Sequence, residues 1–491
     1  MPRRVLRFLR RGRVISLSGF APTTTILDWL RLDERSTGTK EGCAEGDCGA
    51  CTVVVARLRD GQLVYEPVNA CIALLGSLDA AELITVEDLA EGDTLHPVQE
   101  AMVQHHGAQC GFCTPGIVMS LFALHHSHDG EMDRVRVENA LAGNLCRCTG
   151  YKPIVAAALE SCARPAEDRF ARTASERIGA LSALHDDRSL LVGDDDRFFA
   201  APTTSDALAD LLLRYPDAQL VAGATDVGLW ITKGLRRFDR MITVQRITDL
   251  CVIAENDDEI SIGAAVSLAD AARILGALDD DLAMMFDRFG SQQIRSAGTV
   301  GGNIGNGSPI GDLAPCLIAL GATLELRRGE AMRSLPLEDF FLAYRKQDRA
   351  PGEFITRILV PRTGPQDLIR ITKISKRRDE DISSMLMALR LTVDEGRIAM
   401  ARLAFGGMAG IPCRASAAEA VLTGQVLADA ALWRRTAAAL ADDLQPLSDL
   451  RASADYRMQV AQNSVIKALA EMAGIPSHLT RIVPRREMRH V

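Results

Sequence analysis

Cysteine spacing is the feature of this sequence that most constrains its fold. Eight of the twelve cysteines lie between Cys43 and Cys148, in the first third of 491 residues. A secreted disulfide scaffold is usually short and carries cysteines throughout its length. The concentration therefore predicts metal ligation in the first third of the chain. The remaining four are expected to be small core residues: Cys162, Cys251, Cys316 and Cys413.

The first cysteine set has the spacing C-x4-C-x2-C, and nineteen residues separate its third cysteine from the fourth. Its members are Cys43, Cys48, Cys51 and Cys71. Three thiolates on one loop and a distant fourth are typical of a plant-type [2Fe–2S] cluster, whereas zinc sites usually pair two short elements. Gly42, Gly46 and Gly49 leave room for the loop to wrap a cluster and direct its N–H groups at the sulfurs.

The second cysteine set combines C-x2-C with C-x-C, and 32 residues separate the two pairs. Its members are Cys110, Cys113, Cys146 and Cys148. Spacing alone leaves zinc and iron–sulfur ligation both open. Thr114-Pro115 predicts the start of a helix that includes residues 117–124, and further helices are expected at 135–145 and 154–160. Each pair would then lie at a helix end, which favours an anionic cluster.

Composition shifts divide the chain into five segments, in line with a length that suggests about three domains plus connections. Hairpin signals at Arg11-Gly12 and Asp60-Gly61 predict a β-rich start. The segments are a β-rich unit at 1–85, a helical unit at 86–162, a polar acidic linker at 163–195, and a mixed α/β remainder divided at a breaker cluster into 196–368 and 369–491. In the last, strands at 385–393 and 398–405 precede Ala-rich helices between 415 and 473.

Charge and hydropathy exclude two classes of partner. With 64 acidic and 56 basic residues, the net charge of −8 argues against nucleic-acid binding. No apolar run reaches the ~18 residues that a membrane span needs. Arginines interrupt the N-terminal apolar residues, so we expect no export signal and a cytoplasmic protein.

Two glycine-bearing segments are candidate phosphate loops. One runs from Leu220 to Val227 and the other from Thr299 to Asn303. Glycines in such turns free backbone N–H groups for an anion. Neither segment is G-x-G-x-x-G, so a Rossmann fold is unsupported. From the residues alone, tight turns in an ordinary α/β domain remain the alternative.

The strings around the second cysteine set, residues 109–116 and 143–151, closely resemble the helical [2Fe–2S] domain of the molybdenum hydroxylases. That family includes xanthine dehydrogenases, aldehyde oxidases and carbon-monoxide dehydrogenases. The resemblance implies that the second set holds a [2Fe–2S] cluster nearest the molybdenum pterin and the first set a cluster nearer the flavin. It also places Gln109 near the pterin, with a solvated helix-cap residue as the alternative.

The two glycine-bearing segments resemble the FAD-binding domain of the same family, in the vanillyl-alcohol-oxidase type of flavin fold. By this resemblance the pyrophosphate turn is formed by Leu220, Val221, Ala222, Gly223, Ala224, Thr225, Asp226 and Val227, and the second loop by Thr299, Val300, Gly301, Gly302 and Asn303. Asp312 would bind the polar end of FAD, Phe289 would lie near the isoalloxazine, and Ile355 and Lys373 would make further contacts. Ala224 stands where many relatives carry Asn. The resemblance therefore predicts a multidomain α+β fold class. Its parts are a β-grasp plant-type [2Fe–2S] ferredoxin domain at 1–85, a helical [2Fe–2S] domain at 86–162, and an α/β FAD-binding domain at 196–368 with a C-terminal α+β subdomain at 369–491.

The segment from Ile374 to Ser383, which includes the charged run Lys376 to Asp381, resembles the charged loop beside the flavin in xanthine dehydrogenases. The alternative is that such a run is a solvated, self-paired surface stretch. Histidines could suggest a further metal site, but we expect exposed helix-end residues: His105, His106, His125, His126 and His128.

The whole pattern resembles the small iron–sulfur/FAD subunit of a bacterial xanthine dehydrogenase. The resemblance implies a larger molybdopterin-binding partner in an (αβ)₂ heterotetramer, NAD as electron acceptor and oxidation of hypoxanthine and xanthine to urate. No residue of this chain is expected to be catalytic toward the substrate. The alternatives are the equivalent subunit of an aldehyde or nicotinate hydroxylase and a stand-alone iron–sulfur flavin NADH reductase.

Overall fold

The computed structural model describes residues 1–127, 132–163 and 165–481. The chain forms two compact units, one of Met1–Thr248 with Gly290–Gly298 and one of Asp249–Phe289 with Thr299–Val491. The expected FAD-binding domain, 196–368, is thus divided between them. His128, one linker residue and the C-terminal end of the 369–491 segment lie outside the described residues.

The first unit begins with a five-stranded mixed sheet in the order β2-β1-β5-β3-β4. Its strands are β1 (Leu6–Arg10), β2 (Arg13–Leu17), β3 (Thr52–Arg59), β4 (Gln62–Asn69) and β5 (Glu82–Ile84), with short helical segments α1 (Ile26–Asp28), η1 (Trp29–Asp33), η2 (Leu75–Leu78) and η3 (Val86–Asp88). Both expected hairpins form, and their turn residues Arg11-Gly12 and Asp60-Gly61 all have positive φ. Phe8 and Trp29 pack edge to face in its core, with ring centroids 5.3 Å apart.

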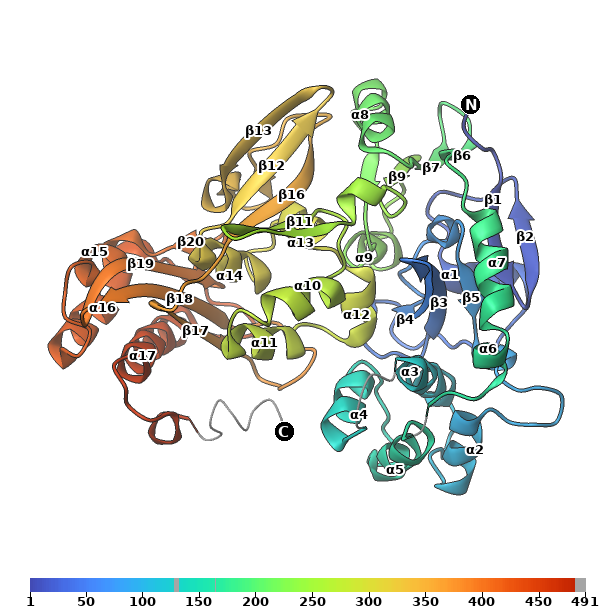
Figure 1. The fold of residues 1–491 in the computed structure, drawn as a ribbon, viewed down its shortest axis with the longest axis horizontal. Helices are drawn as coiled ribbons and strands as arrows, with labels where there is room; N and C mark the ends of the chain where they lie inside the picture. Colours follow the sequence, from blue (N-terminus) through green and yellow to red (C-terminus); the bar gives the residue numbers. More distant parts are fainter. Residues whose placement is uncertain (128–131, 164, 482–491) are drawn as a thin grey trace. The chain divides into compact units, whose positions relative to one another are not determined.

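Four helices follow and lie below this sheet in Figure 1. They are α2 (Pro97–Gln104), α3 (Thr114–His126), α4 (Arg134–Leu141) and α5 (Lys152–Ser161). From the sequence we expect Thr114 as the N-cap of α3 and Pro115 as its first residue; the structure places both roles one position earlier, at Cys113 and Thr114. The helix expected at 135–145 ends at Leu141, before Gly143-Asn144.

The expected linker at 163–195 is structured over much of its length. It contains α6 (Arg169–Arg172), α7 (Ala174–Leu184) and β6 (Leu190–Gly193). Leu181 and Leu184 of α7 are buried against Leu9 of β1. The composition is polar and acidic, but these leucines on one face of α7 are enough to dock it on the first sheet.

The first unit is completed by a four-stranded sheet in the order β6-β7-β9-β8 and by three helices. These elements are β7 (Phe198–Ala201), β8 (Gln219–Val221), β9 (Arg240–Thr243), α8 (Ser205–Arg214), α9 (Val227–Thr232) and α12 (Gln292–Ala297). Phe199 and Met241 of this sheet share one buried cluster with Phe8 and Leu75 of the ferredoxin-like part. α12 packs against β4 (Figure 1).

The second unit contains a five-stranded sheet, β10-β11-β16-β12-β13, a four-stranded sheet, β17-β18-β19-β20, and the pair β14-β15. The strands are β10 (Ile253–Glu255), β11 (Glu259–Gly263), β12 (Thr323–Arg328), β13 (Ala331–Pro336), β14 (Phe341–Ala343), β15 (Lys346–Gln347), β16 (Phe354–Pro361), β17 (Asp367–Ile374), β18 (Met385–Asp394), β19 (Arg397–Gly406) and β20 (Cys413–Arg414). The helical elements are η4 (Thr248–Leu250, at the junction with the first unit), α10 (Leu268–Leu275), α11 (Asp280–Asp287), α13 (Val300–Asn306), α14 (Leu313–Leu320), η5 (Leu337–Phe340), α15 (Ser416–Leu422), α16 (Ala430–Asp443), α17 (Ala454–Met472) and η6 (Ser477–Leu479).

The wholly buried helix α14 packs in one hydrophobic core together with residues of both larger sheets of this unit. Helices α15 to α17 pack against the four-stranded sheet and form a second core with it. The fold class expected from the sequence is confirmed. None of the helices that the structure describes combines the length and hydropathy that crossing a bilayer requires.

Candidate redox centres

The structure brings the first cysteine set together. Cys43, Cys48 and Cys51 lie on the loop between η1 and β3, and Cys71 follows β4. The Sγ atoms of Cys51 and Cys71 are 3.2 Å apart. The Cys43 Sγ accepts N–H groups from Glu45 and Cys48 at 3.4 and 3.3 Å. Backbone donors directed at sulfur are the surroundings that an anionic cluster needs.

Asn69 and two glycines hold this loop in place. The Asn69 side-chain amide donates to the carbonyl oxygen of Gly46 at 2.8 Å and so ties β4 to the loop. Gly46 and Gly49 adopt φ of +78° and +68°, a backbone conformation that residues with a side chain rarely adopt. The expectation that these glycines shape the loop agrees with this geometry.

Close contact between thiols shifts their pKa values in opposite directions. The hydrogen bond from Cys48 lowers the pKa of Cys43 to about 5, and the same bond raises the pKa of Cys48. A hydrogen bond with Cys71, followed by burial, raises the pKa of Cys51. Protons shared in this way are released when a metal binds the thiolates, so the donor set fits an iron–sulfur cluster.

The second cysteine set is also assembled, at the protein surface. The Cys110 thiol pairs with Cys148, and that of Cys113 with Cys146. Burial, and then the neighbouring Cys146 thiol, raises the pKa of Cys113 to about 12. Cys110 and Cys148 are exposed. Gln109 is exposed as well, which is the solvated position named as the alternative.

The loops of the two sets touch directly. The backbone N–H of Leu145 donates to the carbonyl oxygen of Cys48 at 3.0 Å. Cys48 is a ligand candidate of the first set, and Leu145 directly precedes Cys146 of the second set. A Cβ at Gly49 would overlap the carbonyl oxygen of Gly143, and a Cβ at Gly116 would overlap that of Gly49. The two loops and α3 therefore approach at backbone distance, which larger residues at these positions would prevent.

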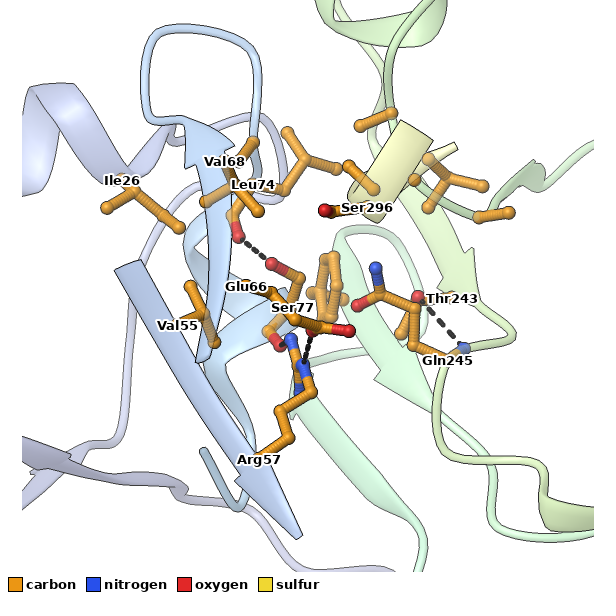
Figure 2. A pocket seen from close by; sticks show the side chains of 17 residues that line it. Ile26, Val55, Arg57, Glu66, Val68, Leu74, Ser77, Thr243, Gln245 and Ser296 are labelled. Atoms are coloured by element: carbon orange, nitrogen blue, oxygen red, sulfur yellow. Dashed lines mark hydrogen bonds and ion pairs between the residues drawn. The ribbon is translucent and has the colours of Figure 1, made fainter. Parts of the chain in front are cut away.

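A small cavity with both polar and apolar lining residues lies between the ferredoxin-like sheet and the β6–β9 sheet of the first unit (Figure 2). Its volume of about 40 Å³ has room for roughly three water molecules, and not for FAD. Arg57 donates to the Ser77 carbonyl oxygen at 2.8 Å on one wall, and the opposite wall includes Val221 to Ala224. The first predicted flavin segment thus borders the ferredoxin-like part.

The first flavin segment is a turn between β8 and α9. Ala224 adopts φ +59°, a left-handed conformation that Asn tolerates better than Ala, so the Asn that the family resemblance leads us to expect here would fit this backbone. A Cβ at Gly223 would overlap the Ala297 carbonyl oxygen at the end of α12. Asp226 is exposed and Val227 is buried.

The second flavin segment begins α13 in the second unit. Thr299 is its N-cap, and its Oγ1 accepts the N–H of Gly302 at 3.0 Å. Gly301 packs against Ala264 without room for a Cβ, whereas Gly302 is exposed. A first turn built of glycines leaves its backbone open to an anion. Val300 is buried, and Asn303 is half-buried.

The remaining flavin candidates also lie in the second unit. Asp312 and Lys373 form a buried ion pair. Ile355 is buried on β16, and Phe289 packs at the edge of the same core. Arg288, next to Phe289, donates to the carbonyl oxygen of Lys373 at 3.2 Å, and burial lowers its pKa. Arg288 was not singled out from the sequence, because no motif marks it.

The charged run Lys376 to Asp381 is largely self-paired. The Arg377 N–H donates to Asp381 at 2.8 Å, and Arg378 faces Asp379 at 3.8 Å. Outside the run, Arg288 donates to the Arg378 carbonyl oxygen at 3.2 Å. The local geometry fits the surface-stretch interpretation.

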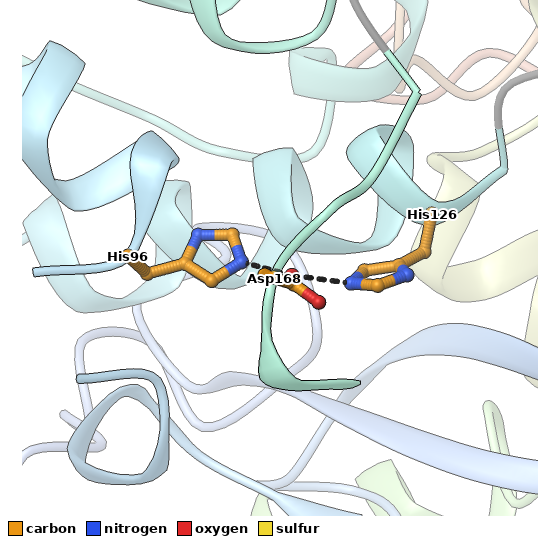
Figure 3. A group of neighbouring side chains, drawn as sticks. All are labelled: His96, His126 and Asp168. Atoms are coloured by element: carbon orange, nitrogen blue, oxygen red, sulfur yellow. Dashed lines mark hydrogen bonds and ion pairs between the residues drawn. The ribbon is translucent and has the colours of Figure 1, made fainter. Parts of the chain in front are cut away.

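The expectation of exposed helix-end histidines was wrong for two of them. His125 is buried, and the side chain of His126 is only 5% exposed. Figure 3 shows His96 and His126 directed at Asp168, with Nε2–Oδ2 distances of 2.5 and 2.8 Å. His105 pairs with Glu160 at 2.6 Å, and His106 is exposed.

The side chains of His96, His126 and Asp168 lie close enough together to hold a metal ion. However, His96 Nδ1 accepts the N–H of Val98 at 3.2 Å, so a neutral His96 carries its proton on Nε2 and donates to Asp168. The group is therefore a carboxylate bound by two imidazole N–H groups. Sequence reasoning missed His96 and Asp168, because they are distant in the chain.

Of the four other cysteines, Cys162 and Cys316 are buried, as expected, and Cys413 is half-buried. Cys251 is exposed, so the core interpretation is wrong for that residue. It precedes β10, an outer strand of its sheet, where apolar burial is not required.

Four domain families match successive parts of the chain. They are the 2Fe-2S iron-sulfur cluster binding domain (residues 12–75), the [2Fe-2S] binding domain (85–159), the FAD binding domain in molybdopterin dehydrogenase (195–363) and the CO dehydrogenase flavoprotein C-terminal domain (370–472). The expected iron–sulfur and FAD domains are thereby confirmed.

Among similar proteins are two xanthine dehydrogenases. That of Emericella nidulans is 32% identical, with 89% of this chain and 36% of the relative covered, and that of Drosophila subobscura is 32% identical, with 95% and 38% covered. The chain thus spans a little over a third of the length of these curated relatives. Carbon monoxide dehydrogenase from Hydrogenophaga pseudoflava has a chain that is 27% identical, with a TM-score of 0.53, 55% of this chain and 95% of that chain covered.

Proposed function

We propose that this chain, which is the iron–sulfur and FAD module of a molybdenum hydroxylase, is the electron-transfer subunit of a xanthine dehydrogenase. In this proposal, two electrons from a molybdopterin-binding partner pass through two [2Fe–2S] clusters to FAD and on to NAD. The observation that carries it is the pair of cysteine quartets whose loops meet at the Leu145–Cys48 hydrogen bond.

Eight thiolates would hold the two clusters, which supply one-electron steps when bound. The ferredoxin domain (1–85) would use Cys43, Cys48, Cys51 and Cys71, and the helical domain (86–162) would use Cys110, Cys113, Cys146 and Cys148. The chain's own contribution is to place the thiolates and to direct N–H groups at them, as Glu45 and Cys48 do for Cys43.

FAD would be held by residues 220–227 and 299–303, with Asp312, Lys373, Phe289 and Ile355 as further contacts. The glycine turn at the start of α13 suits a diphosphate, because backbone N–H groups at a helix start favour anions. These residues belong to the expected FAD domain (196–368) and C-terminal subdomain (369–491).

The surface around the second quartet supports the proposed partner. Phe112 is 48% exposed and Leu145 is 44% exposed, beside the exposed Cys110 and Cys148. Apolar side chains next to an exposed metal-ligand set are suited to burial by another protein. We propose a large molybdopterin-binding subunit there, in a cytoplasmic (αβ)₂ heterotetramer.

The proposed substrates are hypoxanthine and xanthine, supported by the xanthine dehydrogenases among the relatives. An aldehyde or nicotinate hydroxylase would use the same cofactors with a different partner. Co-purification with the partner, followed by assay with hypoxanthine and NAD, separates these candidates. A native complex that lacks molybdenum, or that oxidises aldehydes and no purine, would contradict the xanthine assignment.

Metal analysis tests the two clusters independently of the substrate. We expect about four iron and four acid-labile sulfide per chain. One zinc with two irons would overturn the assignment of the second quartet.

Cys148→Ser tests the electron order. It should leave flavin bound and stop substrate-driven flavin reduction, while NADH-driven reduction continues. Cys413→Ser, a half-buried cysteine outside both quartets, is the matched control and should change neither. Loss of both reductions in Cys148→Ser would contradict the proposed order.

A further inference from the structure

One buried amide joins the loops of both cysteine quartets. Gln293 is 1% exposed and lies on α12, far in sequence from either quartet. The segment Gly290–Gly298 belongs to the first unit, although the chain on both sides of it belongs to the second. A polar side chain that is buried so deeply needs hydrogen-bond partners.

Its partners come from three segments that carry cluster ligands. Gln293 Nε2 lies 3.2 Å from Thr52 Oγ1, 3.1 Å from Ser120 Oγ and 3.0 Å from Asn144 Oδ1. Thr52 directly follows Cys51, and Asn144 is two residues before Cys146. Ser120 lies on α3, whose N-cap is Cys113. The Asn144 side chain also takes part: its Nδ2 donates to the Gly49 carbonyl oxygen at 3.1 Å and to Thr52 Oγ1 at 3.2 Å. Gln293 adds α12 to this group.

The hydrogen-bond directions in this group require a donor from α12. The Ser120 hydroxyl donates to Asn144 Oδ1 at 2.6 Å, and the Thr52 hydroxyl donates to the Gly49 carbonyl oxygen at 2.7 Å. Because each hydroxyl has one proton, both hydroxyl oxygens can only accept from Gln293. The side chain that faces them must therefore carry an N–H, as Gln does and Glu does not.

We propose that Gln293 is a positioning residue that locks the ferredoxin-type cluster loop onto the loop of the helical domain and so fixes the separation of the two clusters. The inference rests on the proposed function, because it requires both quartets to hold clusters. Electron transfer between centres slows steeply with distance, and buried hydrogen bonds rigidify the segments that they join. The bonds of Gln293 are made by its Nε2, whereas its Oε1 is buried without a hydrogen-bond partner among the described residues. The close approaches at Gly49, Gly116 and Gly143 leave little slack for other arrangements.

The experiment compares Gln293→Glu and Gln293→Leu with Gln292→Glu in the holoprotein. Gln292 lies on the same helix, is half-buried and contacts Ser296 and Arg295, both of α12. Iron content and the EPR spectrum of the fully reduced protein report whether both clusters are present and magnetically coupled. Stopped-flow reduction reports the rate at which electrons equilibrate between them.

For both Gln293 variants we expect two clusters per chain, weakened magnetic coupling and electron equilibration slower by on the order of tenfold, since small displacements have large effects on steps that need fixed geometry. Gln292→Glu should match the wild type. Should a Gln293 variant fail to accumulate, Ser120→Ala removes one of the three acceptors and should shift the coupling in the same direction.

Two results would overturn the inference in distinguishable ways. If the wild type shows no pair of [2Fe–2S] signals, the proposed function fails and the inference fails with it. If the wild type shows both signals and coupling, and the Gln293 variants leave coupling and equilibration unchanged, only the positioning role of Gln293 fails.

Discussion

Lys373 Nζ lies 2.5 Å from Asp312 Oδ2, and this ion pair is buried although the two residues are 61 positions apart. The Ser383 hydroxyl donates to the other Asp312 oxygen at 2.6 Å. Asp312 is the N-cap of α14, so the pair fastens the start of that helix to β17. Both residues were predicted from the sequence as separate flavin contacts, and the structure shows that they also hold each other.

Asp312→Asn should lower the stability of the holoprotein by about 3–5 kcal/mol, because it leaves the Lys373 ammonium buried without its partner. Flavin content should fall with it. The double variant Asp312→Leu with Lys373→Met removes both charges and should recover most of the stability. Chemical unfolding and visible flavin absorbance measure the two effects. If the double variant also recovers full flavin content, the pair has no role in binding FAD.

Gly49→Ala should be far more destabilising than Gly61→Ala. Both glycines have positive φ, +68° and +76°, so both substitutions carry a backbone strain of about 1–2 kcal/mol. Only at Gly49 would the new Cβ overlap the Gly143 carbonyl oxygen, whereas Gly61 has open space around it. Thermal unfolding of the two holoproteins measures the difference. Equal losses would show that the loops separate easily.

His125 should make the protein less stable as the pH falls from about 6.5 toward 4. Burial, and then the neighbouring His126 and His96, lowers the pKa of His125 to about 4. The pKa of His125 in the folded protein lies below its unfolded value of about 6.5. The contribution of uncharged His125 to stability is therefore fully present above about pH 6.5 and is lost progressively as the pH falls below it. The slope should approach about 1.4 kcal/mol per pH unit.

Denaturant unfolding between pH 8 and 5 measures this slope. His125→Leu should flatten it, while the exposed His106→Asn should leave it unchanged. The same slope in His125→Leu would show that His125 is not the source of the pH dependence.

Asp168→Asn should destabilise the helical domain without changing metal content. Despite burial, hydrogen bonds from His126 and His96 hold the pKa of Asp168 well below its usual range, so it is a carboxylate at neutral pH. Loss of that charge should cost about 1.5–3 kcal/mol for each charged hydrogen bond. Elemental analysis should find iron but no stoichiometric zinc in either protein. One zinc per chain that disappears in Asp168→Asn would make this cluster a metal site.

Much of the local structure could be predicted from short-range patterns. Cys43, Cys48 and Cys51 lie on one loop. Their spacing could be interpreted from the sequence because the three ligands are close neighbours in the chain. The hairpins at Arg11-Gly12 and Asp60-Gly61 formed for the same reason. The expected linker shows where composition fails as a predictor. The segment 163–195 is polar on average, but Leu181 and Leu184 give α7 an apolar face that is buried in the structure.

The sequence by itself determined the two cysteine sets and the glycine turns, because their chemistry is written in residue type and spacing over short distances. Only the tertiary structure decided which distant groups meet: Leu145 with Cys48, Lys373 with Asp312, and Gln293 with three oxygens from both cluster domains. These contacts depend on how helices and sheets pack, and no local pattern encodes a hydrogen bond between residues up to 241 positions apart.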